Sequence, residues 1–120
     1  MTLETLETYC LSKNGAVKEF PFGNEHMVFK VMGKLFAIIS IEENPLHINL
    51  KATPEDCIVY RHLYACVIPG YHMNKTHWNT VILDGCLDNQ IVLEMIDESY
   101  ALIVGKLTKR QREELSLLSI

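Results

Sequence analysis

The spacing of apolar residues predicts that the chain begins with a short amphipathic helix. Leu3, Leu6 and Cys10 recur at helical spacing near the start of the chain. Thr2 precedes them and is a good helix-capping residue, and Asn14-Gly15 follows them as a natural stop. One face of this helix is therefore expected to pack against the rest of the protein.

Three segments rich in β-branched and aromatic residues follow, and they read as consecutive antiparallel strands. The segments cover residues 16–20, 26–31 and 34–40. If Val31 and Lys34 flank a two-residue turn with Gly33 at positive φ, Phe29 lies opposite Phe36. Both rings would then share the core face of the sheet.

Residues 45–51 alternate strictly between apolar and polar side chains, a pattern typical of a half-buried strand. One face of the strand should therefore join the core. The other face is expected to be exposed and to carry three polar residues without an acid: His47, Asn49 and Lys51.

A second helix is predicted to begin at Pro54, because Thr53 can cap it and acids occupy its first turn. Pro69-Gly70 is expected to end it, and Arg61 to lie on its solvated side. The apolar stripe of this helix is predicted to contain Val59, Leu63, Cys66 and Val67.

The last part of the chain predicts a loop, a strand and two helices. The loop covers residues 71–79, and the strand covers residues 80–83. A long helix is expected from Asp88 to Gly105, followed by a helix that starts with the capping-box pair Thr108 and Gln111 and carries Leu115 and Leu118. The predicted fold is a compact two-layer α+β domain over residues 1–120, with an N-terminal helix, an antiparallel sheet and helices packed on one side.

Length and composition agree with one folded domain, since 120 residues with 48% hydrophobic and 22% charged residues are typical of a globular protein. The N-terminal segment does not resemble a signal peptide, and no apolar run is long enough to cross a membrane. We therefore expect a soluble cytoplasmic protein. The four cysteines are widely spaced and should be reduced thiols, with Cys10, Cys57 and Cys66 serving as small buried hydrophobic residues.

The net charge of −4 argues against a protein that coats nucleic acid by bulk electrostatics. The charge is unevenly distributed, however. Residues 13–80 contain seven basic and six acidic residues, and all five histidines lie between positions 26 and 77. A surface that attracts anions should therefore come from this middle part of the chain.

No constellation of residues indicates an enzyme. His72 and His77 do not match a strong zinc-binding pattern, so no metal is expected. His62 and Cys66 could touch on one helix face, but no oxyanion turn or nucleophile elbow accompanies them. The sequence contains neither a Walker A motif nor GxGxxG, so no nucleotide cofactor is expected.

The most distinctive stretch is PGYHMNKTHWNT, which contains cationic, amide and aromatic side chains but no acid. Such a set can place donors on phosphates while aromatic rings stack on bases or sugars. In the alternative interpretation, Tyr71 and Trp78 fill a corner of the core and Lys75 is a solvated charge. Lys30, Lys34 and Lys51 likewise either protect sheet edges or contribute to a binding surface.

The chain resembles the MmcQ/YjbR family over roughly residues 15–105. The resemblance rests on ordered fragments, of which Pro69-Gly70-Tyr71-His72, Lys75 and His77-Trp78-Asn79 are the most specific. The other fragments are Val17-Lys18-Glu19, Phe22-Gly23, Val28-Phe29-Lys30-Val31, Gly33-Lys34, Phe36, Leu50-Lys51, Pro54-Glu55, Asp84 and Ser99-Tyr100. The resemblance implies a CyaY-like fold in which two hairpins project as a double wing, and it implies a role in binding DNA.

The leading hypothesis is a non-enzymatic protein that binds DNA weakly through its phosphate backbone. The alternative is a module that binds another protein, a small anion or a metabolite. The DNA hypothesis requires separate cations and imidazoles to converge in space. The residues expected to contact DNA are Lys34, Lys51, His72, Lys75, His77 and Trp78.

Overall fold

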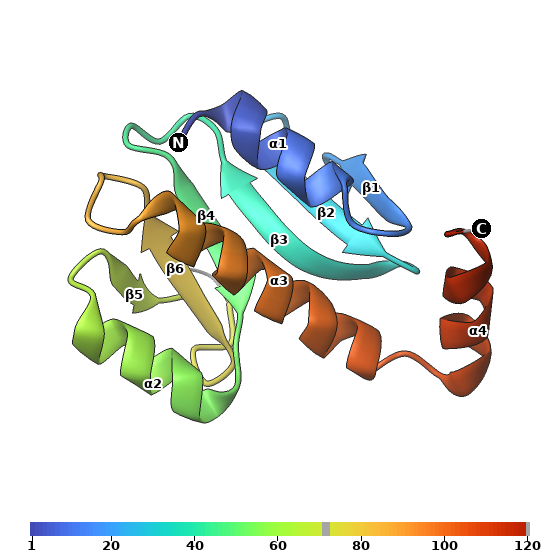
Figure 1. Cartoon of the computed structure of the whole chain (residues 1–120). Coiled ribbons are helices and arrows are strands. Elements are labelled where there is room, and N and C mark those ends of the chain that lie inside the picture. Colours follow the sequence, from blue (N-terminus) through green and yellow to red (C-terminus); the bar gives the residue numbers. More distant parts are fainter. Residues whose placement is uncertain (71–72, 120) are drawn as a thin grey trace.

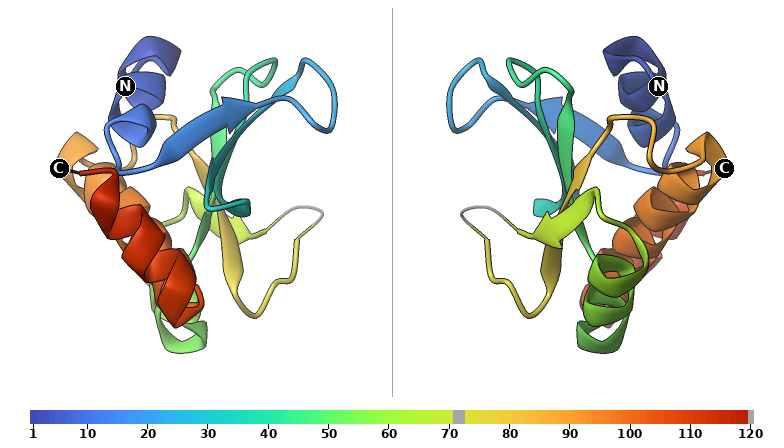
Figure 2. Two further views of the ribbon diagram at one scale, coloured as in Figure 1. Left: turned by 90° about the vertical axis from the view of Figure 1, so that its right-hand side faces the viewer. Right: turned by 90° about the vertical axis from the view of Figure 1, so that its left-hand side faces the viewer.

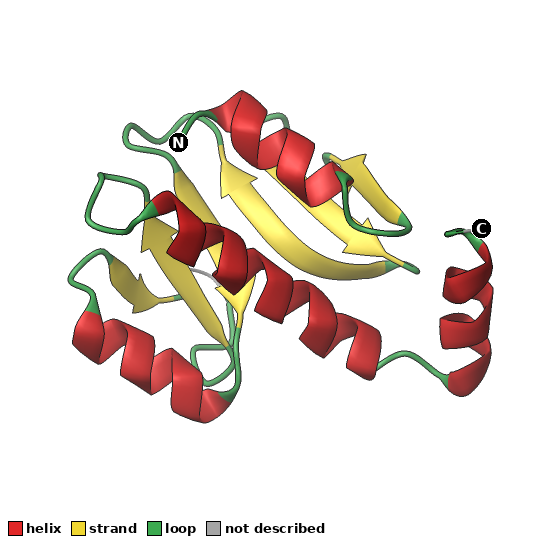
Figure 3. Ribbon diagram, in the orientation of Figure 1, coloured by secondary structure: helices red, strands yellow, loops and turns green. Residues whose placement is uncertain are grey.

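Six strands form one antiparallel sheet in the computed structural model, which describes residues 1–70 and 73–119, in the order β1-β2-β3-β4-β6-β5. The strands are β1 (Ala16–Glu19), β2 (His26–Val31), β3 (Lys34–Ser40), β4 (His47–Lys51), β5 (Val67–Pro69) and β6 (Trp78–Ile82). The helices are α1 (Leu3–Leu11), α2 (Pro54–Leu63), α3 (Asn89–Gly105) and α4 (Lys109–Leu117) (Figures 1 and 3). The predicted α+β fold is confirmed.

All four of these helices lie on one side of the sheet (Figure 2). The long helix α3 crosses that face and packs against β3 and β4, and α1 packs beside β1 (Figure 1). The main core lies between the two layers, where Leu6, Phe29 and Ile96 are fully buried. None of the helices in the described residues is long and apolar enough to cross a membrane.

The turn between β2 and β3 joins Val31 to Lys34 through Met32 and Gly33, as predicted. Both turn residues have positive φ, 49° and 79°, which matches the twist of an antiparallel hairpin. The predicted pairing of Phe29 with Phe36 is wrong, because a β-bulge shifts the register and Phe29 pairs with Ala37. Both rings still belong to the core, with centroids 6.4 Å apart.

The Ser99 hydroxyl of α3 bridges β3 and β4 at the point where their pairing ends. The last pair of this ladder is Ala37 with Leu50, so Phe36 and Lys51 are the next residues along and are not paired with each other. Ser99 Oγ donates to the Phe36 carbonyl at 2.6 Å and accepts from the Lys51 amide at 2.9 Å. A buried side chain thus satisfies two backbone groups that the sheet leaves open.

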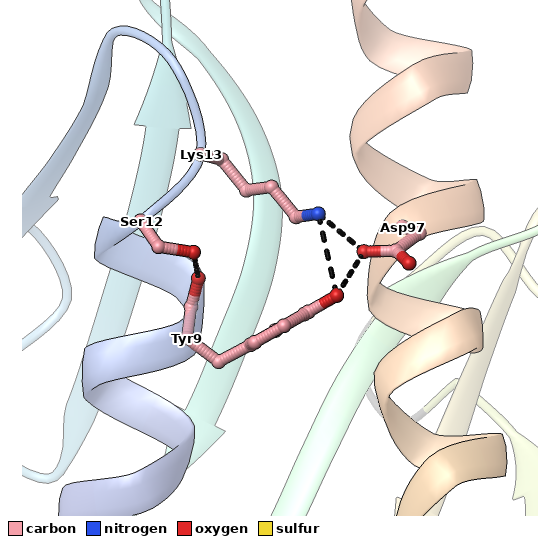
Figure 4. Close-up of polar contacts among 4 residues, drawn as sticks. All are labelled: Tyr9, Ser12, Lys13 and Asp97. Carbon is pink, nitrogen blue, oxygen red and sulfur yellow. Dashed lines mark hydrogen bonds and ion pairs between the residues drawn. The ribbon is translucent and has the colours of Figure 1, made fainter.

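Polar side chains also connect α1 to α3 (Figure 4). The Tyr9 hydroxyl donates to Asp97 Oδ1 at 2.6 Å, and Lys13 forms an ion pair with the same carboxylate. Further along α3, the Tyr100 hydroxyl donates to the carbonyl of Asn14 at 2.7 Å. These contacts hold the N-terminal helix over the sheet and support the predicted amphipathic start of the chain.

The second helix is shorter than its sequence pattern predicts. α2 ends at Leu63, because Tyr64 is extended, and Cys66 and Val67 lie beyond it. Val59 and Leu63 are exposed, and Cys57 is the buried residue of the helix. The predicted stripe is wrong because Val67 pairs with β6 as part of an edge strand, and this pairing outweighs the local helical period.

The predicted helix caps are mostly confirmed. The side chains of Thr2, Thr53 and Thr108 each accept a hydrogen bond from a first-turn amide, and Gln111 completes the capping box. Asp88 precedes α3 but makes no side-chain cap hydrogen bond to a described residue. Leu115 lies in α4 as predicted and is buried, whereas Leu118 follows the last residue of the helix and is exposed.

Removing the Ser99 hydroxyl, a single oxygen atom, should markedly lower the free energy of unfolding. Ser99→Ala leaves the Phe36 carbonyl and the Lys51 amide without their partner in a buried site, so the free energy of unfolding should fall by about 2 kcal/mol. Urea unfolding followed by tryptophan fluorescence measures this change. Ser116→Ala is the control, since Ser116 is exposed on α4. Equal stability of the two variants would contradict the proposed role of the bridge.

Candidate functional site

Two loops project from the helix-free side of the sheet (Figure 2), and residues from both loops line a groove. The first wing is residues 20–25, between β1 and β2, and the second wing is residues 73–77 of the loop between β5 and β6, of which Gly70 is also described. The groove between them has a volume of about 520 Å³. Phe22 and Met73 line it from the two wings, so the groove is the natural candidate for a functional site.

The groove side of β4 is more buried than its alternation of apolar and polar residues predicts, both at Asn49, which lines the groove, and at Lys51, which lies beyond it. Asn49 is 6% exposed and Lys51 is 8% exposed, so the prediction of a fully solvated polar face is wrong. The wings and neighbouring strands cover this face, and Val28 and Ile38 are also buried on it. The Thr80 hydroxyl hydrogen-bonds to Asn49 Oδ1 across the β4–β6 pair.

One end of the groove is acidic and carries two histidines. Ser40 pairs with His26 on one side and with His47 on the other, so the two imidazoles flank its hydroxyl on one face. His26 Nδ1 lies 3.4 Å from Ser40 Oγ. Three carboxylates also line this end, from Glu25, Glu42 and Glu43. This end is unsuited to a phosphate because carboxylates repel it.

The opposite end of the same face holds Lys51 beside Trp78. The two residues pair across β4 and β6, and Lys51 Nζ lies 5.7 Å from the centre of the indole ring. Burial, and next the neighbouring Lys106 ammonium, lower the pKa of Lys51 to about 8. Lys51 forms no ion pair with a residue in the described ranges, and Lys106 lies close to it, so this end is a local concentration of positive charge.

Arg61 of α2 holds the second wing in place. Its guanidinium donates to the carbonyl of Lys75, to the carbonyl of Trp78 at 3.3 Å and to Asn79 Oδ1 at 2.6 Å. The interpretation of Arg61 as a solvated charge is therefore wrong, and no local pattern in the helix indicated its role. Gly70 is required nearby, because a Cβ there would lie 2.9 Å from the Trp78 carbonyl oxygen.

The structure brings together some of the predicted DNA-contacting residues but not all. Lys75 is exposed in the second wing and His77 is half-buried beside it. Trp78 is half-buried and begins β6, whereas the predicted loop extended through residue 79. Lys34 pairs with the core residue Val31, so the register places it on the helix-covered face, away from Lys51.

The sequence singled out three further candidates: His72, the pair His62 and Cys66, and Lys30. His72 lies outside the described residues, so its predicted contact with DNA stays a prediction. His62 and Cys66 do not share a helix face, because α2 ends between them. Lys30, which faces the groove side of β2, is paired with Glu19 at 3.1 Å.

Comparison with known proteins finds relatives over most of the chain. The model of the YjbR family matches residues 11–102. Escherichia coli K12 YjbR is 35% identical over 113 residues, which covers 94% of this chain and 96% of the relative. YbdF of Escherichia coli O157:H7 is 36% identical over 94 residues, or 78% of this chain and 77% of the relative.

Solved structures share the same fold. Deinococcus radiodurans protein DR2400, a DUF419 domain, superposes with a TM-score of 0.90 at 36% identity, covering 96% of this chain and 88% of that one. A Pseudomonas syringae protein has a TM-score of 0.73 at 27% identity, covering 85% of this chain and 98% of that one. The arrangement of the sheet and helices is therefore common to these proteins.

The role of Arg61 predicts a local effect in the second wing. Arg61→Gln removes charged hydrogen bonds to the wing, so the amides of His77 and Trp78 should exchange with solvent at least about tenfold faster. Hydrogen exchange followed by NMR measures this. Arg112→Gln is the control, since Arg112 is exposed on α4. Unchanged protection in Arg61→Gln would show that the wing does not depend on this residue.

Proposed function

We propose that this chain, which belongs to the YjbR family, is a non-enzymatic cytoplasmic protein that binds DNA weakly through phosphate contacts at the lysine end of its groove face. The observation that carries this proposal is the position of Lys51, whose ammonium group lies beside Trp78 and Lys106. An anionic oxygen is the partner that would stabilise two neighbouring ammonium groups.

Lys75 and His77 extend this region into the second wing, where Lys75 is exposed. A backbone phosphate held by Lys51 and Lys106 would lie near the indole ring of Trp78. That ring offers a face on which a sugar or an unpaired base can stack. The arrangement therefore favours contacts to backbone and ring faces over reading of base edges.

Binding should be weak because the rest of the groove face opposes it. Glu25, Glu42 and Glu43 line the other end of the groove, and the whole chain has a net charge of −4. DNA lying along the full groove would meet these carboxylates. The contact is therefore confined to the lysine end, with about three phosphates neutralised and a log-log salt slope of about −3.

This proposal predicts which lysines matter. Lys51→Gln and Lys106→Gln should each weaken binding to a short duplex and reduce the magnitude of the salt slope by about 1. Lys34→Gln is a matched control, because Lys34 is an exposed lysine of the same charge that is not among the charged groups acting on Lys51. Fluorescence anisotropy at low salt is the measurement. No binding at tens of micromolar protein, or an equal loss in Lys34→Gln, would reject the proposal.

The lowered pKa of Lys51, about 8, predicts a dependence on pH. As the pH rises from about 7 to about 9, Lys51 changes from mostly charged to mostly neutral and loses its attraction for phosphate. Duplex affinity should fall over this range, and the salt slope should become shallower by about 1. Lys51→Arg should remove this change, since arginine keeps its charge. The same pH profile in both proteins would assign the titration to another group.

A second candidate function is supported by the groove itself. Its volume of about 520 Å³ is in the range of small-ligand sites, and its lining combines Phe22, Ile38 and Met73 with three glutamates. Such a lining favours a cationic metabolite or a basic peptide over a small anion. If the wild-type protein does not bind the duplex, the result favours the binding of a small ligand or peptide in the groove. If it binds and Lys51→Gln loses that binding, the result favours DNA binding.

A further inference from the structure

Two cysteines and an aspartate meet at the end of β6 that lies farthest from Trp78. Cys66 precedes β5, while Asp84 and Cys86 follow β6. Their ligand atoms, two sulfurs and a carboxylate oxygen, all lie within 4.8 Å of one another. Because the cysteines are 20 positions apart, their spacing matches no compact metal-binding motif.

Backbone pairing places the three residues together. β5 and β6 are antiparallel neighbours, and the Cys66 carbonyl accepts a hydrogen bond from the Ile82 amide at 2.8 Å. The chain then turns so that Asp84 Oδ1 accepts from the Cys86 amide at 2.9 Å. The sheet therefore positions one thiol, and a short turn positions the other thiol and the carboxylate.

We propose that Cys66, Asp84 and Cys86 form a binding site for a zinc-like divalent cation, separate from the groove. Zinc binds thiolates at about 2.3 Å and carboxylate oxygens at about 2.1 Å, so three ligands of one tetrahedron fit within the observed spacing. Two sulfur ligands disfavour magnesium and calcium, which prefer oxygen. A water molecule would supply the fourth ligand.

The burial of the three residues suits such a site. Cys66 is 2% exposed, which protects one sulfur from solvent, whereas Asp84 and Cys86 are exposed and leave a path for the ion. Both thiols lose their protons when the cation binds, so two protons are released for each ion. The bound cation would join the edge strand β5 to the segment that precedes α3.

Cobalt(II) is a suitable probe because its spectrum reports tetrahedral thiolate ligation. The full-length protein, reduced with a phosphine that does not bind the metal, should show a thiolate charge-transfer band that saturates at one cobalt per chain. Zinc should then displace the cobalt and abolish the band. Binding to the native state should also raise the thermal unfolding midpoint.

Variants at the two exposed ligands test the site without disturbing the core. Cys86→Ser should reduce cobalt affinity at least about tenfold and shrink the charge-transfer band, and Asp84→Asn should reduce affinity by a similar factor. Asparagine can still accept the hydrogen bond from the Cys86 amide, so the turn is kept. Asp88→Asn is the matched control, since Asp88 is a nearby exposed acid outside the cluster.

Three results would overturn this inference. The reduced protein could show no saturable band, or the band could persist unchanged in Cys86→Ser. Alternatively, Cys66 and Cys86 could form a disulfide in air, as detected by mass spectrometry, while the reduced chain fails to bind cobalt. None of these results bears on DNA binding, which involves the opposite end of the sheet.

Discussion

The hydroxyl of Ser99 satisfies the backbone where β3 and β4 stop pairing, next to the lysine proposed to bind phosphate. The pairing of β3 with β4 ends at Ala37–Leu50, and the next residue of β3, Phe36, is the extra residue of the bulge opposite β2. Ser99 satisfies the carbonyl and the amide that the end of this pairing leaves open inside the protein. Lys51 is the residue whose amide it holds, so a core hydrogen bond sets the backbone position from which the Lys51 side chain reaches Trp78.

Electrostatics divide the helix-free face into two regions. The end near His26 and His47 collects carboxylates, while the other end brings the ammonium group of Lys51 close to that of Lys106. Strand direction produces this division, since Lys51 and Trp78 lie at one end of their strands and His47 lies at the other. The net charge of the chain therefore says little about the charge that a ligand meets at either end.

Local sequence patterns predicted most of the fold. Threonine caps, the Met32-Gly33 turn and the helical period of α3 each depend on residues close together in the chain, and each is confirmed. The predictions that are wrong concern residues whose strand pairing with a distant segment overrides their local pattern. Val67 has a helical spacing from Leu63 but pairs with Val81, and the extra residue in β3 changes which residue faces Phe29.

For the candidate site, the sequence by itself determined which residue types are available. These are the acid-free stretch around Lys75, with Gly70 at its start, and Lys51 in β4. Tertiary structure decided which of these residues meet. It placed Lys34 on the other face, put Lys51 against Trp78, bonded Arg61 to the second wing and brought the thiols of Cys66 and Cys86 close together. The physical reason is that strand register and side-chain burial depend on contacts between distant segments, whereas capping and turn formation depend on a few adjacent residues.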